Sequence, residues 1–487
     1  MLNFKEGHSA YAVVLATLAF LLFFSSIGVK ELWRVDETRV AGISASMART
    51  GDYWMPRLNG EPFLEYPPMY YWATAGFYQV LGRNPFASRL ASALCALGSV
   101  FLVFLLAREM GFGPPHSFLA GAILATCGEF WAVANRCLVD MMLCFFIVSA
   151  MVCFFKVYRI LHEGETSGGW VLYGFLFSLS LGFAILTKSL VGLAVPSVAL
   201  FFWLVLECLW NRKPYFKSWL ALGFGCLLSA VPALFWLVEI YGNYGMEAVR
   251  TVAEVNAFGR FTGSQGDHLA PFFYYFGKVP EQFLPWTVFL AAVPALMLVY
   301  RKKPVLDRNA RFLVCWILFP FLLLVLSASK RPVYLLPLYP AFALLLSLLL
   351  RKATAEIPIL ARFPWDRIWL SFSALVSLVL VIAGFVLAAL YNDKFTFRPL
   401  FAYYGKSPCA ERPLYLYTPT EAVRGAVNYY LDRDVPVIQD ETELEKVLDS
   451  RSQPACVIAP HFPGIESRGS VKTFVSKGDP WCVMEGR

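Results

Sequence analysis

The stretch at residues 368–391 reads IWLSFSALVSLVLVIAGFVLAALY and contains no charged residue. As an α-helix it is long enough to cross the ~30 Å hydrocarbon core of a bilayer. Similar stretches recur from one end of the chain to the other, and 58% of all residues are hydrophobic while only 16% are charged. The mean hydropathy of +0.56 is far from that of a soluble domain. The sequence therefore predicts a polytopic α-helical membrane protein.

The apolar stretches are separated by short loops that carry charge or proline. We place eleven spans near residues 10–29, 86–107, 116–134, 138–158, 170–187, 189–210, 218–240, 281–300, 312–328, 332–350 and 368–391. The first span follows Lys5, is longer than a usual signal-peptide core and has no small-residue cleavage pattern before Trp33. We expect it to remain as an anchor. An odd number of crossings places the chain ends on opposite sides of the membrane.

The distribution of lysine and arginine predicts which side is which. One set of loops carries most of the positive charge: Lys5, Arg108, Lys156, Arg159, Arg212, Lys213, Lys217, Arg301 to Lys303, Arg308, Arg311, Arg351, Lys352, Arg362 and Arg367. These loops and the N-terminus are expected in the cytoplasm. Segments 30–85, 241–280 and the chain after about residue 392 then face outward. Because these loops account for the net charge of +8, that charge gives no reason to expect nucleic-acid binding.

The first outward segment, residues 30–85, is too long for a simple connection. Residues 37–50 have the pattern of a short interfacial helix that ends at Gly51 and for which Asp36 is a candidate N-cap. Residues 69–81 follow two prolines and are apolar and rich in aromatic residues. They are too short to span, and their aromatic side chains suit the headgroup region.

The tail, residues 393–487, is expected to be a small α/β domain outside the membrane, separate from a transmembrane domain at 1–392. Strand patterns at 414–417, 435–438 and 455–459 alternate with helical patterns at 421–431 and 441–448. The tail contains no glycine-rich phosphate loop and no nucleophile elbow, so we expect it to support acceptor binding or stability. Its three cysteines allow at most one internal disulfide, and no metal-binding cysteine or histidine spacing occurs in the chain.

Several cations lie where the positive-inside rule disfavours them. The three short outward connections hold Arg136, Lys188, Lys330 and Arg331, and the two long ones hold Arg39 and Arg260. Any one of them could reach the interface as an ordinary snorkelling side chain. Six cations on one face instead indicate a site for an anion.

Carboxylates lie on the same predicted face. They are Asp36 and Glu37 after the first span, Glu65 further along the loop, and Asp140 near the outer end of the fourth span. Two structural explanations stay open, because Asp140 could form an i,i+4 salt bridge with Arg136 and Asp36 could serve only as a cap. Cations that bind a phosphodiester beside carboxylates that move protons or hold a metal would suit glycosyl transfer from a lipid phosphate.

The ordered motifs resemble those of bacterial aminoarabinose transferases of lipid A, which belong with protein O-mannosyltransferases to the GT-C membrane glycosyltransferases. They are WRVDETR at 33–39, LNGEPFLEYPP at 58–68, Asp140 at the head of a span, LTK at 186–188, RF at 260–261 with His268, LPW at 284–286 and KRPVYLLP at 330–337. In two places the chain departs from the aminoarabinose branch. Tyr66 stands where that branch has lysine, and Val255 and Asn256 stand where it tends to have a metal-associated histidine.

The resemblance implies roles for the matching residues. Asp36, Glu37 and Asp140 are implied to be catalytic; Arg39, Lys188, Arg260, Lys330 and Arg331 to bind the donor phosphate; and Glu65, Tyr66, His268 and Tyr334 to line the substrate site. No cofactor is implied with certainty, although a divalent metal is possible and Glu65 would be its ligand.

The implied enzyme uses a polyprenyl-phosphate sugar and a lipid A-type or other cell-envelope acceptor at the outer face of the bacterial inner membrane, with inversion at the sugar. Protein O-mannosyl-type transfer is the alternative within the enzyme class, so the acceptor could be a lipid, a glycan or a protein. A transporter or lipid-carrier flippase is the alternative from another class. The sequence shows neither the internal repeats nor the interrupted helices typical of transporters, which favours the enzyme.

Overall fold

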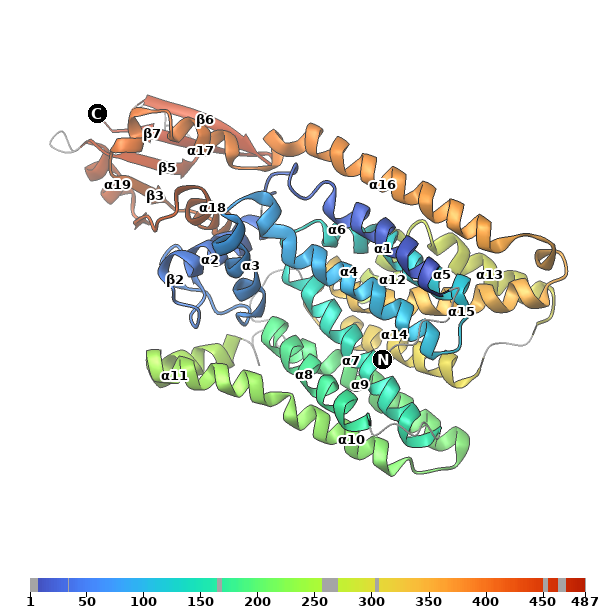
Figure 1. The fold of residues 1–487 in the computed structure, drawn as a ribbon. Coiled ribbons are helices and arrows are strands. Elements are labelled where there is room, and N and C mark those ends of the chain that lie inside the picture. The colour runs from blue at the N-terminus through green and yellow to red at the C-terminus, as the bar shows by residue number, and fades with distance from the viewer. Residues whose placement is uncertain are drawn as a thin grey trace.

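The computed structural model describes residues 8–33, 35–163, 169–255, 270–302, 306–449, 454–462 and 470–486. Most of these residues form one helical bundle, and a small sheet domain lies beyond one end of it (Figure 1). The helices α2 (Asp36–Thr50) and α3 (Met69–Leu81) lie between that end of the bundle and the sheet domain. The predicted fold class, a polytopic helical membrane protein with a small C-terminal domain, is confirmed.

Among the described residues, eight helical segments are long and apolar enough to cross a membrane. They are α4 (Pro85–Glu109), α7 (Val139–His162), α8 (Trp170–Lys188), α9 (Leu190–Asn211), α10 with α11 (Phe216–Leu228 and Ala230–Ala253), α14 (Arg308–Leu326), η2 with α15 (Pro332–Leu338 and Tyr339–Glu356) and α16 (Trp365–Phe395). A ninth predicted span corresponds to α1 (His8–Phe24), which at 17 residues is shorter than these.

The predicted span at 116–134 is broken in the middle, and the predicted span at 281–300 has a sharp bend near its start. The helices α5 (Pro114–Ala125) and α6 (Gly128–Ala134) meet at 65°, and α12 (Tyr274–Gln282) and α13 (Thr287–Val299) meet at 97°. Neither bend was predicted from the sequence. The prolines and glycines at these breaks lie inside otherwise apolar stretches, which is why hydropathy alone does not reveal the bends.

The short helices of the first loop follow the sequence closely, with one correction. The helix α2 ends at Gly51, whose φ of 72° is readily adopted by glycine, and α3 has the predicted bounds. Between them, β1 (Arg57–Leu58) and β2 (Glu61–Pro62) form an antiparallel hairpin. The N-cap of α2 is Val35 and not Asp36, which is the first helical residue and whose side chain binds arginines.

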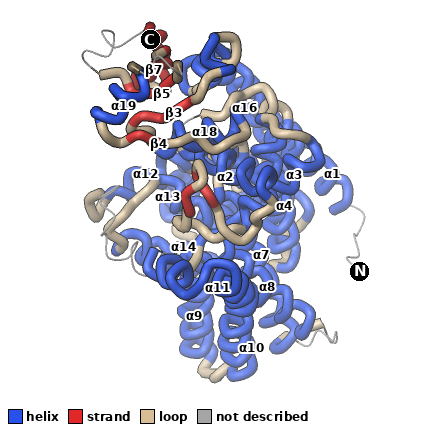
Figure 2. The backbone as a smooth tube through the Cα atoms, turned by 90° about the vertical axis from the view of Figure 1, so that its left-hand side faces the viewer, coloured by secondary structure: helices blue, strands red, loops and turns tan. Residues whose placement is uncertain are grey.

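The sheet domain contains the predicted elements and one further hairpin. The strands β3 (Leu414–Tyr417), β4 (Val437–Ile438) and β5 (Cys456–Pro460) alternate with the helices α18 (Glu421–Leu431) and α19 (Glu441–Leu448). The antiparallel strands β6 (Ser470–Ser476) and β7 (Asp479–Glu485) complete a sheet of order β4-β3-β5-β7-β6. Apart from β1 and β2, the strands found among the described residues all lie in this domain (Figure 2).

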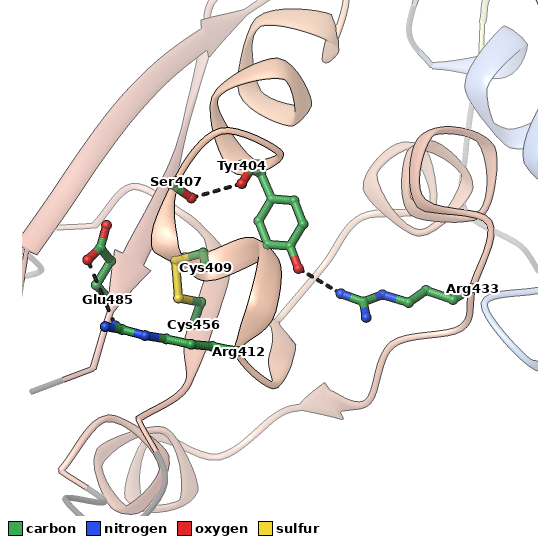
Figure 3. The surroundings of a disulfide bond; sticks show 7 residues. All are labelled: Tyr404, Ser407, Cys409, Arg412, Arg433, Cys456 and Glu485. Carbon is green, nitrogen blue, oxygen red and sulfur yellow. Dashed lines mark hydrogen bonds and ion pairs between the residues drawn. A yellow bond between two sulfur atoms is a disulfide. The ribbon is translucent and has the colours of Figure 1, made fainter.

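A disulfide links Cys409, in the short helix η4 (Pro408–Glu411), to Cys456 in β5 (Figure 3). Cys482, the third cysteine of the tail, is buried and free. The bond joins segments separated by 47 residues and so restrains the unfolded tail. Disulfides persist mainly in compartments outside the cytoplasm.

The sheet domain and the first loop are joined by a hydrogen-bonded contact. The backbone N–H of Asn59 donates to the Asn428 side chain at 2.7 Å, and the Asn59 side chain exchanges two hydrogen bonds of 2.8 Å with the backbone of Val435. All three residues are buried or nearly so. The tail is therefore fixed against the loop that carries several predicted site residues.

Candidate active site

Asp36 lies at the centre of the charged cluster. Its Oδ1 accepts a hydrogen bond from Nη2 of Arg39 at 2.9 Å, and its Oδ2 accepts one from Nη2 of Arg331 at 2.6 Å. Arg331 lies in the connection between α14 and η2, so the two arginines come from distant parts of the sequence. Burial would raise the pKa of Asp36, but the charges of Arg331 and Arg39 outweigh it and hold that pKa below its ordinary value. Asp36 is therefore an anion at neutral pH.

Arg39 is shared by three carboxylates. Besides Asp36, it is bound through Nη1 by Glu65 at 3.1 Å and by Glu421 at 2.7 Å. Its side chain is only 9% exposed. Burial would lower the pKa of Arg39, but the neighbouring negative charge of Glu65 and Asp36 raises it, so the guanidinium keeps its charge.

A second cluster lies at the adjoining ends of two helices. Lys188, the last residue of α8, forms a buried ion pair with Asp140 in the first turn of α7. The Lys188 amine lies 4.4 Å from the ring centre of Tyr334 and 5.7 Å from that of Tyr66. Both rings can stabilise its charge.

The alternative of a helical salt bridge between Arg136 and Asp140 is wrong. The helix α7 begins at Val139, so Arg136 precedes it and the i,i+4 geometry does not arise. The carboxylate of Asp140 pairs instead with Lys188, a residue of another helix.

A pocket opens beside the Lys188–Asp140 pair. Its lining residues are Asp140, Leu143, Lys188, Val191, Ala194, Val195, Leu323, Leu324, Ser327, Ser329, Val333, Tyr334 and Pro337. The polar lining residues are Asp140, Lys188, Ser327, Ser329 and Tyr334, and aliphatic side chains of α7, α9 and α14 form much of the remaining wall. Such a pocket suits a ligand with an anionic head and an apolar body.

The two clusters form one electrostatic site. The charge of Lys188 contributes to the lowered pKa of Asp36. The negative charges of Asp36 and Asp140 both contribute to the raised pKa of Arg331. The structure thus brings together eight of the predicted residues: Asp36, Arg39, Glu65, Tyr66, Asp140, Lys188, Arg331 and Tyr334.

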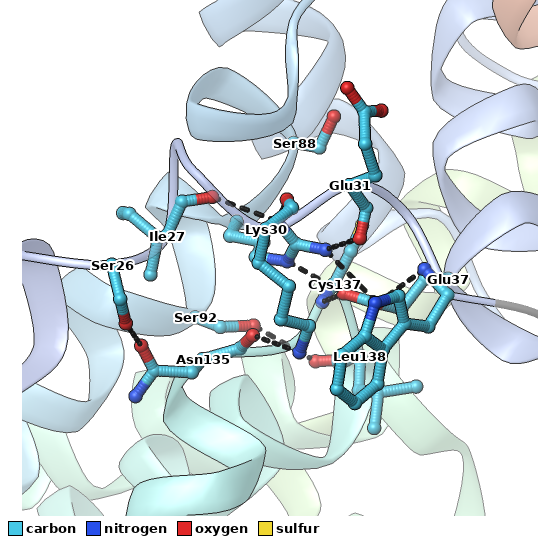
Figure 4. Close-up of polar contacts among 12 residues, drawn as sticks. Ser26, Ile27, Lys30, Glu31, Glu37, Ser88, Ser92, Asn135, Cys137 and Leu138 are labelled. Atoms are coloured by element: carbon cyan, nitrogen blue, oxygen red, sulfur yellow. Dashed lines mark hydrogen bonds and ion pairs between the residues drawn. The ribbon is translucent and has the colours of Figure 1, made fainter. Parts of the chain in front are cut away.

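Glu37 lies in a different environment, within a buried polar cluster (Figure 4). Arg89 donates to both of its carboxylate oxygens, at 2.8 and 3.1 Å, and the backbone N–H groups of Trp33 and Cys137 each donate to one oxygen at 2.9 Å. Burial would raise the pKa of Glu37, but the charges of Arg89 and Lys30 lower it to about 2. These partners occupy the lone pairs of the Glu37 carboxylate, and its catalytic role stays a prediction.

Lys330 is not among the residues that these contacts join. Lys330 is buried, and its amine donates to the backbone carbonyls of Ala270 and Ser327, at 3.2 and 2.5 Å. Arg260 and His268 lie outside the described residues. Within the described ranges, no group of three or more His, Cys, Asp or Glu side chains is arranged to hold a metal. Glu65 itself is paired with Arg39.

Two charged residues of this region were not predicted. Arg89 lies inside the predicted span 86–107, and the reasoning applied to cations at the outer ends of spans would have singled it out. Glu421 lies in the tail domain, where acidic residues are common. No local pattern distinguishes Glu421, and only the fold places it against Arg39.

Comparison with known proteins agrees with the geometry. Residues 9–241 match the family model described as dolichyl-phosphate-mannose-protein mannosyltransferase. The matched segment is just under half of the chain, which is therefore similar to this family over that segment. Curated relatives named undecaprenyl phosphate-alpha-4-amino-4-deoxy-L-arabinose arabinosyl transferase include those of Edwardsiella ictaluri, 29% identical over 343 residues, and Erwinia tasmaniensis, 28% identical over 341 residues. The matched region covers 70% of this chain and 60% or 59% of these two relatives' own lengths.

Solved structures show the same fold across almost the whole chain. ArnT from Cupriavidus metallidurans bound to undecaprenyl phosphate superposes with a TM-score of 0.76 at 20% identity and covers 98% of both chains. The archaeal oligosaccharyltransferase AglB from Archaeoglobus fulgidus gives a TM-score of 0.57 at 12% identity, over 94% of this chain and 69% of its own. The fold of these structures is thereby established for this chain, which is a multi-pass helical membrane protein.

Proposed function

We propose that this protein transfers a sugar from a polyprenyl-phosphate donor to an acceptor of the cell envelope. One observation carries the proposal: Arg39 and Arg331 hold the carboxylate of Asp36, and Lys188, whose charge also acts on Asp36, lines a pocket with aliphatic walls. The pocket would take the phosphate and the first prenyl units. The carboxylate would then lie beside the sugar, where an acceptor must attack.

In this proposal the cations promote departure of the lipid phosphate. As the bond between the sugar and the phosphate oxygen breaks, negative charge grows on the phosphate, and Arg331, Arg39 and Lys188 are placed to stabilise it. When Arg39 and Arg331 donate hydrogen bonds to the phosphate, their hydrogen bonds to Asp36 weaken. Its pKa then rises toward the ordinary value, and the carboxylate becomes a stronger base for an acceptor hydroxyl. Direct displacement of this kind inverts the configuration at the sugar.

For the substrates, we propose 4-amino-4-deoxy-L-arabinose carried on undecaprenyl phosphate and a lipid A-type acceptor. The names of the curated relatives support this choice. The description of the family model instead supports mannosyl-type transfer to protein as the second candidate. Tyr66, which replaces the lysine typical of the aminoarabinose branch, makes the second candidate worth testing directly.

For the location, we propose the bacterial inner membrane with the active site and the tail domain outside the cytoplasm. The positive loops at the other end of the bundle support this orientation, and so does the disulfide between Cys409 and Cys456.

The test uses the full-length protein in nanodiscs and mass spectrometry of the products. Undecaprenyl-phosphate aminoarabinose with lipid A, and polyprenyl-phosphate mannose with an acceptor protein, are supplied in separate reactions. A UDP-sugar without lipid carrier is the control. We expect transfer in the first reaction. Transfer only in the second reaction would change the substrates but keep the mechanism. Transfer from the UDP-sugar, or no transfer from either lipid-linked sugar, would contradict the proposal.

A further inference from the structure

The tail domain reaches into the active site through one side chain. Glu421, the first residue of α18, binds Nη1 of Arg39 at 2.7 Å, which is shorter than the 3.1 Å contact of the same nitrogen with Glu65. The Nε atom of Arg39 is buried and has no hydrogen-bond partner among the described residues. The orientation of the guanidinium therefore depends on what its two terminal nitrogens bind.

We propose that Glu421 is a positioning residue for glycosyl transfer, an inference that rests on the function proposed above. By holding Nη1, Glu421 turns Nη2 of Arg39 toward Asp36. Without it, Nη1 keeps only the longer contact to Glu65, and the guanidinium can rotate away from the reacting groups. The tail domain is then part of the active site and not only an appended support.

The surroundings of Glu421 make such positioning precise. One turn further along α18, a Cβ atom placed on Gly425 would lie 2.4 Å from the carbonyl oxygen of Thr38 and 2.7 Å from Cα of Arg39. The backbone of α18 therefore touches the backbone of α2 beside Arg39 itself. A short rigid connection of this kind fixes the carboxylate of Glu421 relative to Arg39 more closely than a flexible loop could.

The negative charge of Glu421 and its hydrogen bond to Arg39 predict different effects on donor binding and on the reaction rate, so the two roles can be tested separately. Glu421 is 51% exposed and carries negative charge near the site expected to bind phosphate. Removing that charge should not weaken phosphate binding. Removing the hydrogen-bond acceptor should instead misplace Arg39 and slow the reaction of bound substrates.

The experiment compares Glu421→Ala, Glu421→Gln and Arg424→Ala in the full-length protein. Glutamine keeps an acceptor oxygen for Arg39 and loses the charge. Arg424 lies on the same helix and pairs with Glu61 of the first loop, so its removal breaks a contact of the tail without touching the site. The readouts are kcat with donor and acceptor saturating, the Kd for undecaprenyl phosphate, and the thermal unfolding midpoint.

We expect Glu421→Ala to lower kcat about tenfold, and Glu421→Gln and Arg424→Ala to stay within about twofold of the wild type. The Kd for undecaprenyl phosphate should not rise in Glu421→Gln. Equal kcat for Glu421→Ala and the wild type would overturn the inference, as would equal losses in all three variants, which would indicate docking of the tail alone. A wild-type protein without transfer activity would instead contradict the proposed function.

Discussion

Gly42 of α2 and Gly425 of α18 lie backbone against backbone. A Cβ atom on Gly42 would fall 2.3 Å from the carbonyl oxygen of Gly425, so neither position has room for a side chain. Arg39 lies one turn before Gly42, and Glu421 lies one turn before Gly425. The glycine contact therefore sets the distance at which these two charged side chains meet.

Gly425→Ala should loosen the tail domain from the first loop. The added methyl group collides with backbone, which cannot rotate away as a side chain can, and overpacking of this kind costs about 1–3 kcal/mol. We expect a lower thermal unfolding midpoint and faster proteolytic release of the tail. Gly76→Ala in α3, where no atom lies within 4 Å of the added carbon, is the matched control. Equal behaviour of both variants would show that the contact does not support docking.

Asp36→Asn should lower turnover by about 10²–10⁴-fold while the protein remains folded and inserted. Asparagine keeps the size of the side chain and one acceptor oxygen for arginine, but it cannot take a proton from the acceptor. The measurement is initial rate with donor and acceptor saturating. Asp307→Asn, at the N-cap of α14, controls for loss of an aspartate elsewhere in the protein. Near-wild-type transfer by Asp36→Asn would reject the role as base.

Lys188→Met should both destabilise the protein and abolish donor binding, and a double variant separates the two effects. Removing one member of a buried ion pair leaves the other uncompensated, at a cost of about 3–5 kcal/mol. Adding Asp140→Asn removes that uncompensated charge. We expect the double variant to recover most of the thermal stability but not the affinity for undecaprenyl phosphate, measured in nanodiscs. Recovered affinity would mean that Lys188 does not bind the donor phosphate.

Glu37→Gln should change the pH dependence of stability. The pKa of Glu37 is about 2 in the folded protein against an ordinary 4.5. Its ionised form therefore stabilises the fold fully above about pH 5, by about 3 kcal/mol, and this contribution is lost as the pH falls toward 2.

The unfolding midpoints of the wild type and of Glu37→Gln should differ most near pH 7 and converge in acid. Glu443→Gln, an exposed residue of α19, provides the control and should follow the wild type at every pH. A constant difference between the wild type and Glu37→Gln would contradict the assignment of the lowered pKa to Glu37.

Cysteine labelling tests the orientation of the whole protein. Cys409 and Cys456 are buried and joined in a disulfide, so they cannot serve as reporters unless reduced. Ala410→Cys lies at an exposed position of the tail, and Lys302→Cys lies in a predicted cytoplasmic loop. In intact cells an impermeant thiol reagent should label the first variant, and should label the second only after the membrane is opened. The reverse pattern would invert the topology and move the proposed site to the cytoplasm.

Local sequence was sufficient for most elements of secondary structure. The bounds of α3 follow from two prolines before it and Gly82 after it, and the tail helices α18 and α19 follow from their periodicity. The hairpin of β6 and β7 was missed, although it completes the sheet beside β5. The catalytic role of Asp36 stays a prediction, but the alternative explanation, the helix cap, proved wrong because its carboxylate turns toward arginines.

By itself, the sequence determined that the chain spans a membrane many times, which loops carry the positive charge, and which residue types were available for a phosphate site. These properties depend on composition and on neighbours within one or two helical turns. Only the tertiary structure decided which charges meet. Asp36 and Arg331 are separated by 295 residues, and Arg39 and Glu421 by 382. Such contacts depend on how whole helices and the tail domain pack together, and no local pattern of residues contains that information.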